Sequence, residues 1–588
     1  MSEGQISDLS TLVLPDGTIS VDEINIHDCL TERMENCFRQ NTSPQLDAYL
    51  PYVVPPHSHI SGWERAISEP GYIINHPNLQ YIPLDLLEVI EYAFQSNRTN
   101  SALITDMSAA FADDNPITIA EFEAQIKGCS NDKSPGLTGF TINMMKKLPV
   151  ECREYIYHLI STFWTFGSDN HIPSFWKDRF LALIPKDKNK AISADRVRPI
   201  SLYEVTRKIW TGAIMKRITN LWDRHKAVND TQNAYRRHKG VDLPVLQVIN
   251  AVQNILADST ELLCSSYDIQ QCFDSVNRPL VIASYMRLGV PKHIARSLVL
   301  LDIDGATIIR TSHSIKSLAR GRQYLSTLVE KSDHQTAKIF IARDGIGQGD
   351  KTAAPSFTAI SDIENVALER LHTLAVSRGV TTTSCLPVLF PLGNQFLKAI
   401  PPIIYADDKN ILSNTFEHAQ LAADIISGFS CIAGFTQNFK KFRYGAGSWN
   451  GPLPPLILHD KDWNAIPIAP EIPLKVRILG VDICLLNHWS SLQKESRTLL
   501  TSSLGMVNKR KVPVGAKIMY FSMKIIPTVA YRLQFTSISL VKTEKLTRLA
   551  EPFLRSALNL LPSHPSANLY MCRKHFGLQV PNLKIKLN

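Results

Sequence analysis

The sequence has no run of about 20 apolar residues, the length that a helix needs to cross a bilayer. Its N-terminus has no basic segment followed by an apolar stretch, so neither a secretory signal nor a mitochondrial presequence is predicted. We therefore expect no membrane association and a location in the cytoplasm, the nucleus or both. With 44% apolar and 20% charged residues the composition is typical of globular proteins, and 588 residues predict more than one domain.

The ten cysteines include no C-x-x-C pair, and their scatter suits reduced thiols better than a disulfide framework. No structural zinc site is predicted. Internal repeats and low-complexity tracts are absent as well.

Lysine is missing from residues 1–114, which hold four arginines and 17 acidic residues. Residues 491–588 have the opposite bias, with 16 basic and three acidic residues. Local charge, more than the net charge of +9, decides what a polyanion meets. The basic segment therefore fits a nucleic-acid grip, although a solvated surface would have the same composition.

The chain divides into three parts by composition. Residues 1–115 form an acidic extension, helical or irregular and of unknown function; residues 116–481 mix helix and strand patterns; residues 482–588 are basic and helical. Local patterns predict helices at residues 29–40, 84–95, 117–129 and 543–561 and a strand at 180–186. We expect residues 303–340 to be an inserted loop and residues 452–473 to link the middle part to the C-terminal helices.

Two acidic sites carry the chemistry. Asp407 and Asp408 stand between two short apolar runs, which predicts a hairpin with both acids at its turn. Adjacent carboxylates repel each other and lose hydration when buried, so cations such as Mg²⁺ stabilise them; taken alone, such a pair is more often an exposed turn. Asp268 ends another apolar run and supplies a third carboxylate. Carboxylates from neighbouring strands are what two-metal nucleotidyl transfer requires.

The chain resembles the reverse transcriptases of non-LTR retrotransposons, and more distantly those of group II introns, over residues 117–560. Any one of the matching motifs is weak, but they follow the family's order. They are Lys133-Ser134-Pro135-Gly136, Leu148-Pro149, Trp176, Ile184-Pro185-Lys186, Arg198-Pro199-Ile200-Ser201-Leu202, Gln232-Asn233-Ala234-Tyr235, Asp268 with Phe273-Asp274-Ser275-Val276, Gly345 to Asp350, Tyr405-Ala406-Asp407-Asp408, Gly434-Phe435, Asn438-Phe439-Lys440-Lys441 and Ile478-Leu479-Gly480-Val481.

The resemblance implies an α/β (α+β) right-hand polymerase fold, with a palm built on an antiparallel sheet with packed helices. Fingers and palm would occupy residues 116–481 and the thumb residues 482–588. The implied activity is RNA-directed DNA synthesis, in which dNTPs are added to a primer 3′-hydroxyl with two Mg²⁺ ions, or Mn²⁺ in their place. The implied partners are an RNA template, a DNA primer and dNTPs.

Site roles are implied residue by residue. Asp268, Asp407 and Asp408 match the catalytic metal ligands. Asp274 belongs to the segment that follows Asp268 and is not itself one of the implied ligands. Phe273 matches the aromatic residue under the incoming sugar, where it would block a ribose 2′-hydroxyl; plain core packing is the alternative.

Five further positions match basic or loop residues of the family. Lys186 and Arg198 would meet the triphosphate, unless they are ordinary surface charges. Gln348 and Gly349 would line the nucleotide and template, unless they form an ordinary turn. Lys441 resembles the lysine proposed as general acid for pyrophosphate departure, with Lys440 as a competing assignment.

Three departures from the family leave other readings open. Asp350-Lys351-Thr352 replaces a Pro-Leu-Ser-Pro-like segment, Lys409 follows the acid pair where a neutral residue is commoner, and the 303–340 stretch is long. A catalytically decayed or domesticated RNA-binding relative is the first alternative, and a group II intron maturase is the second. Residues 1–114 are too few for an apurinic-type endonuclease, so we expect a polymerase core without one.

Overall fold

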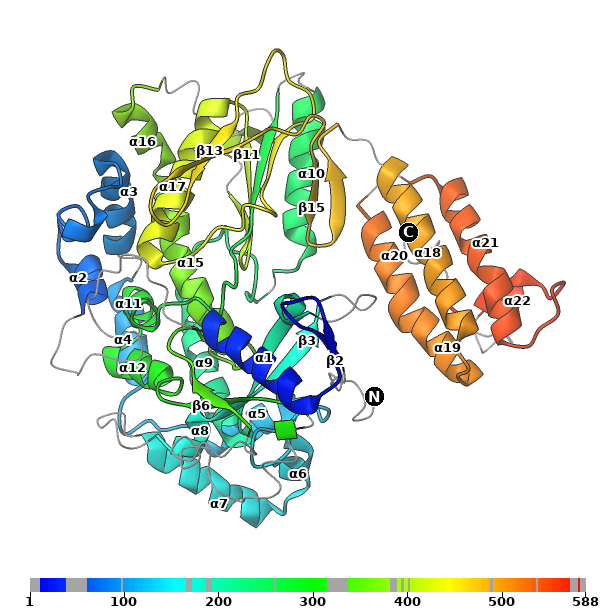
Figure 1. The fold of residues 1–588 in the computed structure, drawn as a ribbon, viewed down its shortest axis with the longest axis horizontal. Coiled ribbons are helices and arrows are strands. Elements are labelled where there is room, and N and C mark those ends of the chain that lie inside the picture. Colours follow the sequence, from blue (N-terminus) through cyan, green and yellow to red (C-terminus); the bar gives the residue numbers. More distant parts are fainter. Residues whose placement is uncertain are drawn as a thin grey trace.

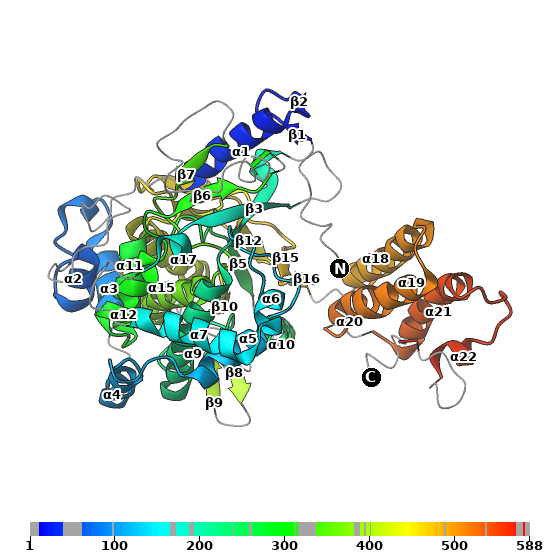
Figure 2. The ribbon, with the colours of Figure 1, turned by 90° about the horizontal axis from the view of Figure 1, so that it is seen from below.

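The computed structural model has two separate four-stranded sheets with helices packed on them, and a C-terminal group of helices that stands apart (Figure 1, Figure 2). This mixed content agrees with the predicted α/β class. No helix among the described residues is long and apolar enough to cross a membrane. The described residues are 11–38, 61–96, 99–164, 172–186, 193–237, 239–257, 261–311, 313–314, 337–380, 389–392, 396–399, 402–486, 490–535, 538–571 and 580–581.

The first sheet joins, in order, β10 (Ile403–Tyr405), β11 (Asp408–Ser413), β5 (Leu263–Tyr267) and β12 (Arg443–Ala446), and all its pairings are antiparallel. Side chains alternate between its two faces. Leu263 and Ile411 join the core that includes α15 (Ala353–Glu369) and α17 (Phe416–Ala433). Cys264 and Leu412 join the core formed with α10 (Asp242–Ala257), β15 (Lys475–Ile478) and β16 (Val481–Cys484).

The second sheet joins, in order, β4 (Val197–Leu202), β3 (Arg179–Pro185), β6 (Ala306–Ile309) and β7 (Ile339–Ile341). β3 pairs antiparallel with β4 and parallel with β6. Because β6 and the start of β7 lie within residues 303–340, the prediction of an inserted loop is wrong at both of its ends. The middle of that stretch, residues 315–336, lies outside the described residues. The short runs of isoleucine, threonine and phenylalanine in β6 and β7 suit strands, and pairing with β3 completes them.

Residues 452–473 form a packed hairpin, so the prediction of a linker there is wrong. β13 (Leu456–His459) pairs with β14 (Ala465–Ile468). Leu456 and Leu458 are fully buried because alternate residues of β13 face the core with α17. The Gln420 side chain on α17 donates to the Ile457 carbonyl and accepts from the Ile457 N–H.

The other local predictions are confirmed, with the helix predicted at residues 29–40 described only up to residue 38. The capped helix is α5 (Ile119–Gly128), whose N-terminus has a capping box formed by Thr118 and Glu121. The remaining predicted elements are α1 (Glu23–Cys37), α3 (Leu84–Gln95), β3 and α21 (Leu540–Ala557). The other elements of the main body are β1 (Leu12–Val13), β2 (Ile19–Ser20), α2 (Gly62–Ser68), α4 (Ser101–Ala110), α6 (Ile142–Lys147), α7 (Val150–Ser161), α8 (Ser174–Lys177), α9 (Val205–His225), α11 (Arg278–Arg287), α12 (Lys292–Leu300), α16 (Leu371–Ser377), β8 (Leu389–Leu392) and β9 (Phe396–Ala399).

The described part of residues 1–115 packs into the main body. α1 covers one face of the second sheet, where Leu30 and Met34 pack against Leu181 and Phe340. α2 and α3 pack against α11, α15 and α17. The acidic extension therefore contributes apolar side chains to the cores beneath both sheets.

His27 fixes α1 to the second sheet. Its ring nitrogens lie 3.0 Å from the Thr311 hydroxyl and 3.2 Å from the Lys338 carbonyl. Burial lowers the pKa of His27 to about 4, so the folded chain keeps it neutral while the unfolded chain takes up a proton near pH 6.5. The contribution of His27 to the free energy of unfolding is therefore present above pH 6.5 and is lost as the pH falls towards 4.

We expect this loss to be about 2 kcal/mol between pH 7 and pH 4.5. Denaturant unfolding at the two pH values measures it, with His27→Gln as the variant that cannot titrate. His372→Gln, at an exposed histidine, is the matched control and keeps the wild-type pH dependence. Equal pH dependence in wild type and His27→Gln would contradict the prediction.

The C-terminal helices have a core of their own around Leu500, Val529 and Leu554. They are α18 (Ser490–Lys509), α19 (Val514–Tyr520), a π-helix (Phe521–Ile525), α20 (Ile526–Leu533), α21 and α22 (Ser566–Tyr570). They contact the main body at the β15–β16 hairpin, where the Tyr531 hydroxyl donates to the Leu479 carbonyl at 3.2 Å and Phe535 packs beneath the strands.

Candidate active site

Three aspartates meet at one end of the first sheet. β10 and β11 form a hairpin in which Tyr405 pairs with Asp408, so the turn consists of Ala406 and Asp407. β11 also pairs with β5, with Lys409 opposite Tyr267. The next position in this antiparallel register places Asp408 opposite Asp268, directly after β5. The register therefore brings the three predicted metal ligands to the same edge.

The turn requires an unusual backbone, and Gln232 supports it. Ala406 has φ +57°, a left-handed conformation that costs a residue with a side chain about 1 kcal/mol or more. Gln232 is fully buried, and its Oε1 accepts from the N–H groups of Ala406 and Ala234, each at 3.0 Å. The Asn233 N–H donates to the Ile404 carbonyl at 2.9 Å. This segment therefore holds the acidic hairpin in place from the side.

The carboxylates of the hairpin resist ionisation. Loss of hydration, followed by repulsion from Asp407 and Asp268, raises the pKa of Asp408 to about 6. Loss of hydration raises the pKa of Asp407 as well, with a further contribution from Asp268. A cation bound between these groups would offset both effects. The donor set is thus chemically suited to a divalent metal with oxygen ligands.

Asp268 is held by two other groups. Its carboxylate accepts from the Asn438 side chain at 2.8 Å and forms an ion pair with Lys441 at 3.0 Å. Among the described residues, no three acidic, histidine or cysteine side chains stand in a metal-binding arrangement. The three aspartates are thus suited to a metal by their oxygen donors and by the strand register, while in this structure Asp268 is paired with Lys441.

Lys409 points away from the acidic edge. Successive residues of a strand face opposite sides, so Lys409 faces the helices while Asp408 faces the site. Its ammonium group forms an ion pair with Glu364 on α15, and both side chains are 1% exposed. The charge of Lys409, unusual for the family at this position, is thus paired with Glu364 and not with a predicted metal ligand.

The loop with Gln348 and Gly349 is anchored to the second sheet. The Ser201 N–H donates to the Gln348 carbonyl at 2.6 Å. Gly349 has φ +117°, and a Cβ there would lie 2.5 Å from the Ser201 carbonyl oxygen, so only glycine fits this close approach.

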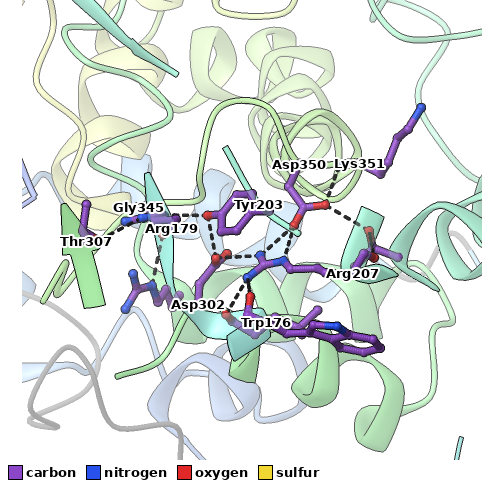
Figure 3. Close-up of polar contacts among 12 residues, drawn as sticks. Trp176, Arg179, Tyr203, Arg207, Asp302, Thr307, Gly345, Asp350 and Lys351 are labelled. Atoms are coloured by element: carbon purple, nitrogen blue, oxygen red, sulfur yellow. Dashed lines mark hydrogen bonds and ion pairs between the residues drawn. The ribbon is translucent and has the colours of Figure 1, made fainter. Parts of the chain in front are cut away.

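Asp350, the next residue of this loop, takes part in a buried charge network (Figure 3). The Arg207 guanidinium forms ion pairs with Asp350 at 2.6 Å and Asp302 at 2.8 Å, with all three side chains buried. The Tyr203 hydroxyl donates to Asp302 at 2.9 Å and accepts from Arg179 at 2.7 Å. Burial alone would raise the pKa of Asp302, but Arg207 and neighbouring arginines lower it below its usual range. Asp350 therefore fixes the end of the loop.

Lys186 directly follows β3 and Arg198 lies in β4 of the second sheet, whereas Phe273 follows β5 of the first. Arg198 is opposite Ile184 in the β3–β4 pairing, so Arg198 and Lys186 share one exposed face. Phe273 is half-buried against Phe357, with ring centroids 5.6 Å apart. Next to it, burial raises the pKa of Asp274 to about 7 against the opposing charges of Arg179 and Lys186.

A basic groove of about 370 Å³ lies between β12 and the β15–β16 hairpin, and its lining includes Lys441, the partner of Asp268. Its walls carry five cations and two acids, so its character is positive. The cationic residues are Lys440, Lys441, Arg443, Lys475 and Arg477.

Sequence reasoning gave no role to Gln232, Asn438 or Arg207. The first two lie within recognised motifs, but their partners are 174 and 170 residues away in the chain. Arg207 is in a helix rich in basic residues and has the pattern of a surface charge. Only the fold identifies it as buried.

Comparison with known proteins identifies the family of this chain. The family described as reverse transcriptase (RNA-dependent DNA polymerase) matches residues 184–483, just over half of the chain. The chain is also similar to the RNA-directed DNA polymerase from mobile element jockey of Drosophila melanogaster, at 24% identity over 176 residues. That alignment covers 30% of this chain and 19% of the relative, so the chain spans about a fifth of the relative's length. The family match shows that this chain belongs to the reverse transcriptases.

Proposed function

We propose that this chain is an RNA-directed DNA polymerase of the non-LTR retrotransposon type. The observation that carries the proposal is the strand register that brings Asp268, Asp407 and Asp408 to one edge of the first sheet, within the range matched by the family. The similarity to the jockey polymerase favours the non-LTR type.

In this proposal the first sheet with its helices is the palm, and the second sheet belongs to the fingers. Fingers and palm occupy residues 116–481, the C-terminal helices at 482–588 are the thumb, and residues 1–115 are an extension. The thumb is attached at the β15–β16 hairpin, which also borders the basic groove. A primer and template are polyanions, so the groove and the basic thumb suit the duplex that they form.

The roles of the chain's own residues follow from their positions. The three aspartates would hold two Mg²⁺ ions, which when bound activate the primer 3′-hydroxyl and neutralise the departing pyrophosphate. Gln232 keeps the acidic hairpin in its left-handed turn, and Phe273 closes the space beside the sugar against a 2′-hydroxyl. Lys186 and Arg198 attract the triphosphate from the exposed face of β3 and β4. Gln348 and Gly349 line the nucleotide, and Lys441 is available to protonate the leaving group once it releases Asp268.

Primer extension on poly(rA)·oligo(dT) with dTTP and Mg²⁺ tests the proposal. We expect incorporation of dTTP that stops on chelation of the metal, returns with excess Mg²⁺ and prefers dTTP to UTP. RNA binding is measured in parallel by a salt titration. A folded, RNA-binding chain that incorporates no dTTP would overturn the proposal and favour the decayed RNA-binding relative.

Gln232→Met is expected to lower both stability and activity. It leaves two buried N–H groups without an acceptor, which costs about 2 kcal/mol or more of unfolding free energy. Displacement of the acidic hairpin is expected to reduce kcat by about ten- to a hundredfold. Gln420→Met is the matched control, because Gln420 makes similar hydrogen bonds to Ile457 away from the hairpin. A kcat for Gln232→Met equal to that of the control would show that Gln232 has a structural role only.

A further inference from the structure

Residues 11–38 lie outside the range that matches the family, and no role has been assigned to them. They form the β1–β2 hairpin and α1, which lies beside β6 and β7 (Figure 1, Figure 2). The apolar face of α1 completes the core on that side of the sheet. The C-terminal end of α1, however, also contacts residues outside this core.

The last turn of α1 contacts two loops of the candidate active site. The Gln271 side chain donates to the Cys37 sulfur at 2.9 Å. Gln271 lies between Asp268 and Phe273 and has a left-handed backbone with φ +50°. The Phe38 carbonyl accepts from the N–H groups of Arg343 and Asp344, at 3.1 and 3.2 Å. These two residues begin the loop that continues to Gln348 and Gly349.

The same loop is held from its other side by Arg278. This guanidinium is fully buried and donates to the carbonyls of Arg343, Asp344 and Gly345, at 3.0 to 3.3 Å. The N–H groups of Arg343 and Asp344 thus bind α1, and the carbonyls of this part of the loop bind Arg278. The next two N–H groups, of Gly345 and Ile346, donate to the carbonyls of Val276 and Phe273, each at 2.9 Å. Carbonyls at a helix C-terminus have no partner within the helix, so Phe38 is free to serve this loop.

The Phe38 side chain adds a third connection. It is 1% exposed, its ring packs 6.2 Å from that of Phe340, and the Arg179 guanidinium lies 5.3 Å from its centroid. Arg179 also donates to Tyr203, in the network that anchors Asp350. One helix end therefore joins the loop after Asp268, the loop before Gln348 and strand β3.

We propose that Cys37 and Phe38 are positioning residues for the nucleotide site. Together with the direct bond between the Ile346 N–H and the Phe273 carbonyl, they fix the loop with Phe273 relative to the loop with Gln348 and Gly349, and so set the width of the space for the sugar of the incoming nucleotide. This inference rests on the proposed polymerase function and assigns part of the N-terminal extension to the nucleotide site.

Steady-state primer extension with Cys37→Ala tests the contact to Gln271. The KM for dTTP is expected to rise about fivefold, the effect of losing one hydrogen bond, with kcat nearly unchanged. The preference for dTTP over UTP falls by a similar factor, which a purely structural role would not produce. Cys37→Ser restores a polar partner and is expected to recover most of both values. Cys29→Ala, eight residues earlier on the same helix, is the matched control and keeps the wild-type preference.

Hydrogen exchange in the metal-free chain gives a readout that needs no activity. Phe38→Ala is expected to speed exchange in peptides covering 268–274 and 343–349 about tenfold, while peptides from α17 stay protected. If the wild type incorporates dTTP but Cys37→Ala leaves KM, the dTTP preference and exchange in 268–274 unchanged, the positioning role is wrong. If the wild type incorporates no dTTP, the proposed activity fails, and accelerated exchange in both loops would still support the link through α1.

Discussion

Asp407→Asn is expected to reduce dTTP incorporation by on the order of a hundred- to a thousandfold, the range typical for loss of one electrostatic stabiliser of a transition state. The amide keeps the size of the side chain but lacks the charge that binds a cation. The same change is expected to stabilise the metal-free chain, because burial and Asp268 raise the pKa of Asp407 and so disfavour its charged form near pH 7. Activity and stability should therefore change in opposite directions.

Primer extension and thermal unfolding in a chelator measure the two effects. Asp114→Asn, at an exposed aspartate in the turn after α4, is the matched control and should change neither. RNA binding by Asp407→Asn should equal that of the wild type, because the basic groove is untouched. If Asp407→Asn retained a tenth or more of wild-type incorporation, Asp407 would not be a catalytic metal ligand.

Arg207→Met is expected to cause the largest loss of stability. The substitution leaves Asp302 and Asp350 buried next to each other without their shared cation, and breaking such buried pairs costs on the order of 3–5 kcal/mol. Asp350→Asn should cost clearly less, because Arg207 keeps Asp302 as its counter-ion and the amide still accepts a hydrogen bond. The order of the two variants is thus a direct consequence of the arrangement in Figure 3.

Denaturant unfolding of both variants measures this order. Arg548→Met removes an exposed pair with Glu544 and is the matched control, with an expected change within about 0.5 kcal/mol. In Arg207→Met we also expect weaker nucleotide binding, because Asp350 anchors the loop with Gln348. An Asp350→Asn variant as unstable as Arg207→Met would show that Asp302 alone does not satisfy the arginine.

Local signals in the sequence predict local structure well. The capping box of α5, the apolar run of β3 and the two strands around the acid pair each depend on neighbouring residues, and each forms as predicted. The charged residues beneath the site are different. Lys409 pairs with Glu364, and Arg207 with Asp302, only when the helices pack together. Nothing near these residues in the sequence indicates that they are buried.

The predictions for the segments with short strands are wrong for a related reason. β6 and β7 have too few residues to produce a clear alternating pattern and depend on pairing within the second sheet. β13 shows an alternation of leucines, but the prolines around it resemble a linker. Long-range pairing therefore decides the places where the sequence predictions are wrong.

The left-handed backbone at Ala406 has a consequence for the variation that this position tolerates. Ala406 contributes no functional group, and its side chain ends at Cβ. Glycine at this position would relieve the strain. A β-branched residue would disfavour the left-handed backbone, so the turn would change its conformation and both aspartates would leave their register in the hairpin. In a gene that accumulates random substitutions, working copies should therefore keep alanine or glycine at position 406 almost as strictly as they keep the acids that follow it.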